Sequence, residues 1–382
     1  MFSKNIFSQS KKEVDIVAFD IPYPPNYGGV IDVFFKIKAF KTAGVKVNLH
    51  CFEYGRKQSQ ELESICERVF YYKRDISKAN LFRRRPYIVV TRSSADLINN
   101  LLQTHNPILF EGLHSCYYLD DKRLKKRRKI VRTHNIEHDY YQNLAKVEKD
   151  IFKKYYFSNE AQKLRRFEQI LENADGIAAI SLHDKGYFSE KFDNVKAVSA
   201  FHPNEKVNIG NGLGSYVLYH GSLAVGENNE AGLFLVNNVF NDIDTPFIIA
   251  GNKPSKELRN AAEKNNNIII KSEISTSDIY NLIAGAQINI LPTFQATGVK
   301  LKLLAAIFTG RHCIVNDPMV KDTGLGGLCI VKNSAIEMKN AIQECFTKEL
   351  TTEEIEERKS LLNEGIFSNT YNINQLAEML FS

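Results

Sequence analysis

The sequence lacks the features of a secreted or membrane-spanning protein. Its six cysteines are scattered over 382 residues without C-x-x-C spacing, which argues against a disulfide framework and against a thiolate zinc site, and suits a reducing cytoplasm. No stretch of about 18 apolar residues occurs, so no transmembrane helix is expected. The start, MFSKNIFSQSKKEVD, has no apolar core of signal-peptide length. We therefore expect a cytoplasmic protein that can contact the inner face of the cytoplasmic membrane peripherally.

Several signatures of catalysis are also missing. Neither the dinucleotide fingerprint G-x-G-x-x-G nor a P-loop is present, which argues against NAD-dependent and ATP-driven chemistry. No carboxylate pair and no Ser-His-Asp arrangement stands out, so no side-chain nucleophile is predicted. The hydrophobic fraction of 43% and the charged fraction of 25% are those of an ordinary soluble globular protein.

The net charge of +6 is mild and permits an anionic ligand or surface without requiring one. Two basic runs, FRRRP at 82–86 and KRLKKRRK at 122–129, have two open interpretations. They form a solvated surface, or they contact anionic lipid headgroups, where each basic residue contributes about 1 kcal/mol. Nucleic acid is not an expected partner, because aromatic residues are not interleaved with the basic ones for base stacking.

Short β-rich runs alternate with helix-length segments along almost the whole chain. Strand, helix and strand in succession indicate βαβ units and parallel sheets, and 382 residues suit two domains of roughly 150 to 200 residues each. An amphipathic helix is predicted over 30–44 and one long helical stretch over 139–174. The predicted strands are 13–20, 45–52, 68–74, 107–112, 129–135, 176–181, 216–222, 246–252, 267–272, 288–293 and 312–317.

The pattern restarts near residue 215, which predicts an α/β protein with two Rossmann-like, doubly wound parallel-sheet domains that face a cleft. The first domain is placed at 1–200, a Gly- and Asn-rich linker at 201–215, and the second domain from 216 onward. Open α/β sheets bind ligands at the carboxyl ends of their strands. The segments that follow strands are therefore the candidate binding loops.

One such loop is PPNYGG at 24–29, which joins the first strand to its helix. Two prolines stiffen it, and Gly28 and Gly29 allow close backbone approach just before a helix N-terminus. Unpaired backbone N–H groups at that position suit an anion such as a diphosphate. A tight strand–helix turn without a ligand is the alternative.

A second candidate is RTHNIEHDYY at 132–141, which contains the inverted zinc-protease pattern H-x-x-E-H in His134, Glu137 and His138. Such a site needs all three residues on one helix. The residues before His134, KIVRT, are instead typical of a strand, so the two histidines are not expected to share a face and no metal is predicted. His134 becomes a candidate for polar contact with a substrate, or a structural residue bonded to backbone. Arg132, Asn135 and Glu137 are placed to hold a sugar hydroxyl or to orient the histidine.

The third candidate is LPTFQATGVKLKLLAAIFTG at 291–310, a strand end, a loop and a helix expected to start near Thr297 and Gly298. Thr297 can cap this helix and leave N–H groups free for an anion. At 100° per residue Lys300 falls on the apolar side in the first turn, whereas Lys302 points away from it. A lysine there is unfavourable for the helix dipole unless an anion is bound. Lys300 is therefore the better phosphate candidate, and Lys302 is expected to be solvated unless the helix starts later.

In order and spacing these segments resemble the retaining GT-B glycosyltransferases, which transfer a sugar from a nucleotide-diphosphate donor. More narrowly, the sequence is similar to bacterial envelope-polysaccharide glycosyltransferases of capsule or surface-glycan clusters. The resemblance covers most of the chain and rests on PPNYGG (24–29), RTHN (132–135), ISLHD (180–184), HGSLA (220–224), AGNKP (250–254), SDIYNLIAGAQINILPT (277–293), and the loop and helix that end at Gly310, followed by HCIVN (312–316).

The resemblance implies that the glycine-rich loop faces the donor phosphates and that His134 lies beside the donor sugar. It implies that the second domain, 216–365, binds the nucleotide sugar, and that 366–382 form a last helix crossing back to the first, acceptor-side domain. A nucleotide sugar and a glycan or lipid-linked acceptor are the implied partners, with no cofactor and no metal. Residues implied by position are Gly221 and Ser222 for the phosphates, with Glu111, Asn135, Glu137 and Asn252 as secondary cleft candidates.

The chain departs from the family pattern at both of its charged elements. The two glutamates of the usual E-x(7)-E frame fall on Thr297 and Ala305, and the usual Arg and Lys after the first strand of the second domain fall on Ser222 and approximately Asn228. Either Lys300, helped by Lys302 and the helix N-terminus, replaces the missing cations, or transfer activity has been lost.

The sequence thus predicts His134 and Lys300 as catalytic residues, and Gly28, Gly29, Gly221, Ser222, Thr297, Gly298 and Lys302 as the phosphate site. Preorganised N–H groups and a lysine would stabilise the charge that develops on the departing diphosphate by several kcal/mol. Two alternatives stay open. One is another GT-B enzyme, such as a sugar-nucleotide epimerase or an inverting transferase. The other is a non-catalytic sugar-nucleotide-binding partner of a glycan assembly complex.

Overall fold

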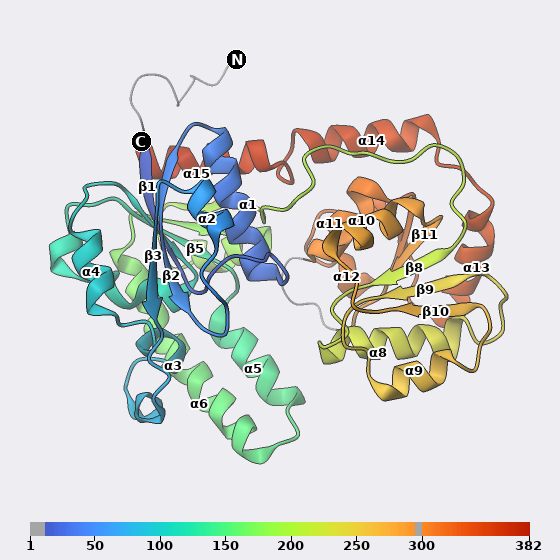
Figure 1. Cartoon of the computed structure of the whole chain (residues 1–382), viewed down its shortest axis with the longest axis horizontal. Coiled ribbons are helices and arrows are strands. Elements are labelled where there is room, and N and C mark those ends of the chain that lie inside the picture. The colour runs from blue at the N-terminus through green and yellow to red at the C-terminus, as the bar shows by residue number, and fades with distance from the viewer. Residues whose placement is uncertain (1–11, 295–299) are drawn as a thin grey trace. The chain divides into compact units, whose positions relative to one another are not determined.

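The structure is a computed structural model that describes residues 12–294 and 300–382. The chain divides into two compact units (Figure 1). Unit 1 contains the chain up to Pro203 together with Ile366–Ser382, and unit 2 is Asn204–Gly365.

Unit 1 is built on a parallel sheet with the strand order β3-β2-β1-β4-β5-β6-β7. The strand β1 lies in the middle, β2 and β3 follow outward on one side of it, and β4 lies on its other side. The strand order therefore switches direction between β1 and β4. The strands are β1 (Glu13–Ala18), β2 (Lys46–Glu53), β3 (Arg68–Lys73), β4 (Ile108–Glu111), β5 (Lys129–Thr133), β6 (Gly176–Ala179) and β7 (Val195–Ala197).

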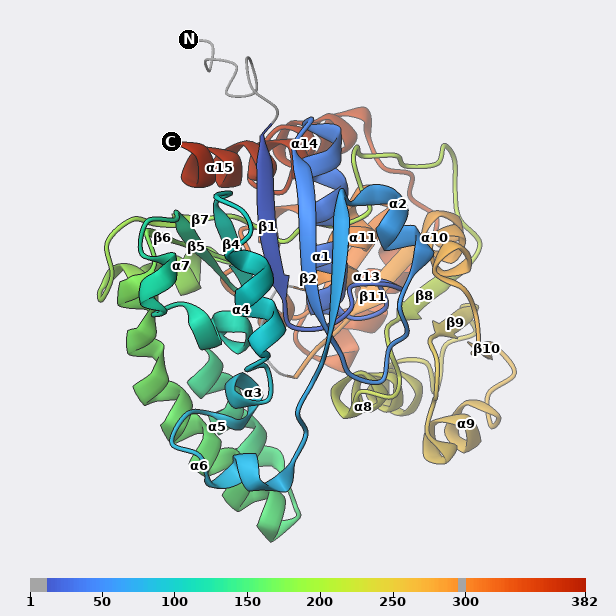
Figure 2. The same cartoon turned by 60° about the vertical axis from the view of Figure 1, so that its left-hand side comes forward.

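Helices cover both faces of this sheet (Figures 1 and 2). One face packs on α1 and α15 through a core that includes Ile16, Ile37 and Leu376, and the other packs its own core around Val17, Phe110 and Leu164. The helices are α1 (Gly28–Thr42), α2 (Gln60–Ile65), α3 (Tyr87–Val90), α4 (Ala95–Leu101), α5 (Glu137–Val147), α6 (Ile151–Phe167), α7 (Leu182–Ser189) and α15 (Asn369–Phe381), with 3₁₀ turns η1 (Lys78–Phe82), η2 (Leu113–Tyr118), η3 (Lys122–Leu124) and η4 (Glu168–Asn173).

The single helical stretch predicted over 139–174 is wrong. It is divided into α5, α6 and η4, because Asp150 accepts a hydrogen bond from the Lys153 N–H and caps a new helix. The helices α5 and α6 form a hairpin that projects from the carboxyl edge of the sheet (Figures 1 and 2).

Unit 2 repeats the doubly wound plan with a parallel sheet of order β10-β9-β8-β11-β12-β13, whose direction switches between β8 and β11. The strands are β8 (Val217–His220), β9 (Phe247–Ala250), β10 (Ile268–Lys271), β11 (Ile288–Leu291), β12 (His312–Val315) and β13 (Ile330–Val331). The helices are α8 (Gly226–Phe234), the π-helical turn η5 (Leu235–Val239), α9 (Lys256–Ala262), α10 (Thr276–Gly285), α11 (Leu301–Thr309), α12 (Asp317–Val320), the 3₁₀ turn η6 (Gly326–Leu328), α13 (Ala335–Phe346) and α14 (Thr352–Asn363). The predicted α/β class with two doubly wound parallel sheets is confirmed.

The segment that follows Pro203 packs within unit 2. The N–H of Asn208 donates to Phe308 O, and the N–H of Gly214 donates to the side chain of Gln287. These bonds make much of the segment expected as a linker, 201–215, part of the unit 2 body.

The returning C-terminal segment is bonded to the outgoing one inside unit 1. The Asn372 side chain accepts from the Ser199 N–H, and the Asn369 side chain exchanges hydrogen bonds with both backbone groups of His202. Among the described helices, none is both long and apolar enough to span a bilayer.

Candidate functional site

In each unit, charged side chains lie where the strand order switches direction, which is the usual ligand position in open α/β sheets. The two clusters are described separately below.

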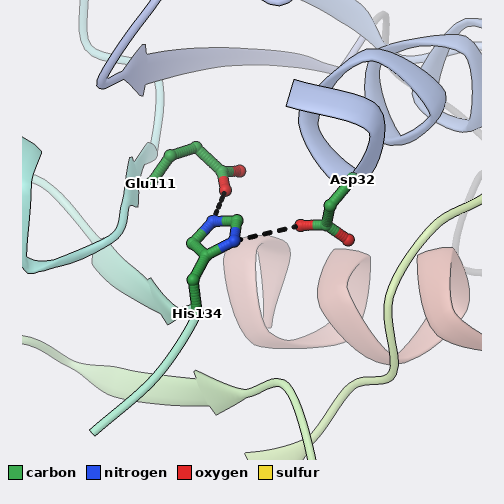
Figure 3. Close-up of side chains that lie close together, drawn as sticks. All are labelled: Asp32, Glu111 and His134. Carbon is green, nitrogen blue, oxygen red and sulfur yellow. Dashed lines mark hydrogen bonds and ion pairs between the residues drawn. The ribbon is translucent and has the colours of Figure 1, made fainter. Parts of the chain in front are cut away.

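The cluster of unit 1 is a buried charge network around Glu111, the last residue of β4. Lys36 Nζ lies 2.6 and 2.8 Å from the two Glu111 oxygens and 2.9 Å from Asp32 Oδ2, one turn earlier on α1. Arg132 of β5 binds the other Asp32 oxygen at 3.2 Å. His134, directly after β5, donates through Nε2 to Glu111 Oε2 at 2.9 Å (Figure 3). Two carboxylates thus face a lysine and an arginine.

This network has a structural function in addition to any chemical one. Burial alone would raise the pKa of Asp32, but Arg132 and Lys36 outweigh it and hold that pKa well below its usual value. The pKa of Glu111 is lowered in the same way, against burial, by Lys36 and His134. Asp32 also accepts the Phe201 N–H, so α1, β4, β5 and the chain near the unit boundary are connected through one set of bonds.

Asp32, Glu111 and His134 offer three ligand atoms within 4.8 Å of one another, the spacing of a metal site. The space between the two carboxylates is already occupied by the Lys36 ammonium. A divalent cation would have to displace a fully buried lysine and would add to charges that Lys36 and Arg132 already neutralise. The residues present therefore do not fit a metal ion.

His134 directs both ring nitrogens at carboxylates, since Nδ1 lies 3.9 Å from Asp32 Oδ2 (Figure 3). Glu111 thus engages Nε2 in a hydrogen bond, whereas Nδ1 is beyond hydrogen-bond distance from Asp32. The other histidine of the H-x-x-E-H pattern, His138, lies in the first turn of α5 and faces Glu168 at 3.2 Å. The two histidines have different partners, so the pattern does not form one site.

Glu137 and Asn135 lie at the start of α5, beside His114 of η2. Glu137 Oε1 is 3.6 Å from His114 Nδ1, and both atoms are buried without a hydrogen-bond partner. Burial raises the pKa of Glu137 to about 8, although a hydrogen bond from Asn135 opposes the rise. Burial and Arg92 lower the pKa of His114 well below its usual range. Near neutral pH a protonated carboxyl thus faces a neutral imidazole.

The loop at 24–29 leads into α1 without a side-chain cap. Tyr27 is the N-cap residue, and its hydroxyl donates to Asp20 at 2.8 Å instead of bonding the helix N-terminus. Gly29 is needed for packing, because a Cβ there would lie 2.7 Å from the Phe19 ring, whereas a Cβ on Gly28 would meet nothing within 4 Å. Gly28 is exposed, so the first N–H groups of α1 are free of side-chain caps, as an anion site requires.

In unit 2, two lysines from the start of α11 converge on the start of α8. Lys300 Nζ lies 3.6 Å from Glu227 Oε1, and Lys302 Nζ donates to Asn228 Oδ1 at 2.8 Å while lying over the ring of Tyr219. Thr293, after β11, donates its hydroxyl to the same Glu227 carboxylate. One carboxylate and two ammonium groups thus lie beside the carboxyl ends of β8 and β11.

The helix α11 begins at Leu301 with Lys300 as its N-cap residue, later than the start expected near Thr297 and Gly298. Contrary to the expectation for the earlier start, Lys302 is not solvated, because its ammonium binds Asn228 and lies over the Tyr219 ring. Burial, together with the charge of Lys300 and against that of Glu227, lowers the pKa of Lys302 to about 8. Burial lowers the pKa of Lys300 as well. Thr297 and Gly298, the other predicted phosphate ligands of this loop, lie outside the described residues.

The remaining predicted residues of unit 2 follow its central strands. Gly221 comes directly after β8, and the carbonyl of the exposed Ser222 accepts a hydrogen bond from the Asn228 side chain. Asn252 is exposed after β9. The residue before it, Gly251, has to be glycine, because a Cβ there would lie 1.9 Å from Gly221 O.

Several polar residues of these clusters were not predicted. Asp32 and Lys36 are four residues apart on the apolar side of α1, and that spacing of opposite charges among buried positions was the available signal. His220 is buried at the end of β8 with Nε2 unpartnered, and burial and Lys302 lower its pKa to about 3. Glu227 has no signal in the sequence, because only the folded chain brings it to α11.

The two basic runs are partly structural. In 122–129, Arg127 binds Asp15, Arg128 binds the Met379 carbonyl and Lys129 binds the Leu119 carbonyl. In 82–86, Arg85 binds Asp120, whereas Arg83 and Arg84 are exposed. Lipid contact through the whole of both runs is therefore not supported.

No protein-family model matches the sequence. The chain is 27% identical over 315 residues to an uncharacterized 44.6 kDa protein in the cps region of Klebsiella pneumoniae, and the match covers 77% of this chain and 80% of that protein. The sucrose-phosphate synthase of Thermosynechococcus elongatus superimposes with a TM-score of 0.67 at 14% identity, over 96% of this chain and 98% of the synthase. The lipopolysaccharide outer core galactosyltransferase WaaB superimposes with a TM-score of 0.62 at 14% identity, over 97% and 99%. The fold of this chain is therefore the GT-B fold of two Rossmann-like domains.

Proposed function

We propose that this protein is a glycosyltransferase that moves a sugar from a nucleotide-diphosphate donor to a glycan or lipid-linked acceptor, with retention at the transferred carbon, in the synthesis of a cell-surface polysaccharide. The GT-B fold supports the reaction class. The relative in the cps (capsule) region of Klebsiella pneumoniae supports the polysaccharide context.

The observation that carries the proposal is the position of Lys300 and Lys302. The resemblance assigns the usual cations for the leaving diphosphate to Ser222 and approximately Asn228, neither of which is basic. Lys302 Nζ binds Asn228, and Lys300 Nζ lies beside Glu227, so ammonium groups from α11 reach the place where those cations are missing. With Glu227 the two lysines carry a net charge of +1, which favours an anionic ligand.

In this mechanism the chain supplies binding and electrostatic stabilisation. As the bond between the sugar and the diphosphate breaks, negative charge grows on the leaving oxygen, and Lys300 and Lys302 are positioned to stabilise it. The acceptor hydroxyl attacks the same face of the sugar and gives its proton to the leaving oxygen. An anion beside Lys302 raises the pKa of that ammonium above its value of about 8, so donor binding keeps it protonated.

The test is titration calorimetry with UDP and GDP on the wild type and on Lys300→Met and Lys302→Met, which keep the side-chain length and remove the charge. We expect the affinity for the diphosphates to fall at least tenfold in either variant, with unchanged affinity for the uncharged nucleosides. Lys264→Met, an exposed lysine before β10, is the matched control and should change neither. Unchanged diphosphate affinity in both site variants would refute the donor site.

A second experiment separates transfer from binding alone. Ala305 is a buried residue of α11 where the family pattern has a glutamate, and this absence favours the alternative of a non-catalytic sugar-nucleotide-binding protein. The wild type is incubated with UDP-, GDP- and CMP-sugars and a lipid-linked acceptor, and the products are identified by mass spectrometry. A glycosylated acceptor supports the transferase, whereas tight donor binding without product across the panel supports the binding protein.

A further inference from the structure

The tip of the α5–α6 hairpin exposes large apolar side chains to an unusual degree. Ile151 is 78% exposed, Phe152 is 87% exposed and Tyr155 is 75% exposed, and Val147 at the end of α5 is also exposed. Together with Phe82 of η1 at 91%, Ile151, Phe152 and Tyr155 are the four most exposed large apolar residues of the described chain. We call Val147, Ile151, Phe152 and Tyr155 the hairpin tip.

The exposed apolar residues of α6 share one side of the helix. At 100° per residue, Ile151, Tyr155 and Phe152 fall within an arc of about 100°, and Lys154 and Lys153 lie on the two sides of that arc. Both lysines are exposed. An apolar arc bordered by lysines is the pattern of helices that lie at a membrane interface.

The surroundings of the hairpin tip are positively charged. Over residues 146–154 four lysines outnumber Glu148 and Asp150, and Asp150 is occupied as the α6 cap. The turn η1, which carries Phe82 and precedes the exposed Arg83 and Arg84, is bound to the same helix nearer its other end, by a hydrogen bond from Lys163 Nζ to Leu81 O at 2.8 Å. A second copy of the same surface would bring like charges together, whereas an anionic bilayer has the complementary charge.

We propose that the hairpin tip is the surface by which this protein docks on an anionic lipid bilayer. The apolar side chains enter the headgroup layer, and the neighbouring lysines contact lipid phosphates. The hairpin tip is a different surface from the basic run 122–129. In that run Arg127, Arg128 and Lys129 already bind other groups of unit 1.

The direction of the hairpin determines which edge of the unit 1 sheet would face the bilayer. The helix α5 starts directly after β5, beside His134, and its 11 residues lead about 16 Å away from the carboxyl edge of the sheet (Figures 1 and 2). A bilayer at the hairpin tip would therefore face the carboxyl edge of the unit 1 sheet. That edge is the acceptor side in the proposed function, but the docking itself does not depend on that function.

The test is co-sedimentation of the full chain with vesicles of phosphatidylcholine containing 30% phosphatidylglycerol, compared with pure phosphatidylcholine. We expect binding to the anionic vesicles only, and at least tenfold weaker binding for Ile151→Ser and for Phe152→Ser. Because a lysine near an anionic surface contributes about a fivefold change in affinity, removing two charges in Lys153→Gln with Lys154→Gln should weaken binding about thirtyfold.

The control is an exposed isoleucine of unit 2. Ile336 is 72% exposed in α13, so Ile336→Ser matches Ile151→Ser in chemistry and exposure. It should leave vesicle binding unchanged, and circular dichroism checks that each variant is folded. Binding that is equal with and without phosphatidylglycerol, or equally weakened by Ile336→Ser, would overturn the proposal. So would a dimer in analytical ultracentrifugation that Ile151→Ser dissociates while vesicle binding persists. Vesicle binding requires no turnover, so its failure and failure of the proposed transfer reaction are distinguished.

Discussion

The buried carboxyl of Glu137 predicts a specific dependence of stability on pH. Burial raises its pKa from 4.5 to about 8, so the folded protein holds a proton that the unfolded chain has already released at neutral pH. The stabilisation is fully present below pH 4.5 and is lost as the pH rises through about 8. Glu137→Gln keeps the shape of the side chain but never acquires a charge.

The size of the effect follows from the pKa values. Each pH unit between the unfolded and the folded pKa is equivalent to 1.36 kcal/mol, so the window from pH 4.5 to about 8 amounts to about 5 kcal/mol. Between pH 5 and pH 8 the stability of Glu137→Gln relative to the wild type should therefore rise by about 4 kcal/mol. Histidines with lowered pKa values, such as His220, also change stability over this range, but they do so equally in both proteins and cancel in the difference.

The assay is urea unfolding followed by far-UV circular dichroism, since the chain has no tryptophan, with one transition fitted for each unit. Glu168→Gln is the control. Burial raises the pKa of Glu168, but hydrogen bonds with His138, Tyr187 and Lys191 outweigh burial and lower it. Its variant should lose stability by the same amount at pH 5 and pH 8. If the stability difference between Glu137→Gln and the wild type is also the same at pH 5 and pH 8, Glu137 is ionised in the folded protein and the reasoning is refuted.

Two further predictions concern the stability of unit 1, measured in the same unfolding assay. Lys36→Met leaves two buried carboxylates without their shared cation and should lower the free energy of unfolding by about 3 to 5 kcal/mol. Its control, Lys38→Met at an exposed position of the same helix, should change that free energy by less than about 0.5 kcal/mol. Equal effects of the two substitutions would show that the buried network contributes nothing to stability. Leu376→Ala in α15 removes a fully buried side chain and should cost about 2 to 5 kcal/mol. Asn374→Ala on the exposed side of α15 is its control, and a loss as small as the control's would mean that this helix is dispensable for unit 1.

The sequence was sufficient for those parts of the fold that depend on local pattern. Alternating strands and helices predicted two parallel sheets, and strand-end positions such as Glu111 and His134 were located correctly. The short edge strands β7 and β13 were not predicted, because three and two residues are too few for a periodic signal. The division of the 139–174 helix depends on one capping residue, Asp150, in a segment that otherwise has helical propensity.

The site was harder to predict than the fold, because its contacts join residues far apart in the sequence. Lys36 and Glu111 are 75 residues apart, and Lys302 and Asn228 are 74 residues apart. The burial of Lys302 also depends on such contacts, since its ammonium binds Asn228 and lies over the ring of Tyr219, and no local pattern around α11 indicates either partner.

The two switch-point clusters differ in charge balance, and this difference assigns them different roles. In unit 1 the carboxylates of Asp32 and Glu111 are matched by Lys36 and Arg132, all four buried, so the network is satisfied without a ligand and serves to fix the strand ends and His134. In unit 2 Lys300 lies beside Glu227 and Lys302 binds the uncharged Asn228, and the cost of burying the two ammonium groups appears as lowered pKa values. An anion bound there would recover that cost, whereas an anion at the unit 1 network would have to break an existing ion pair. Diphosphate binding is therefore predicted at the sheet of unit 2. The network of unit 1 is predicted to orient His134 and the strand ends rather than to stabilise the charge of a ligand.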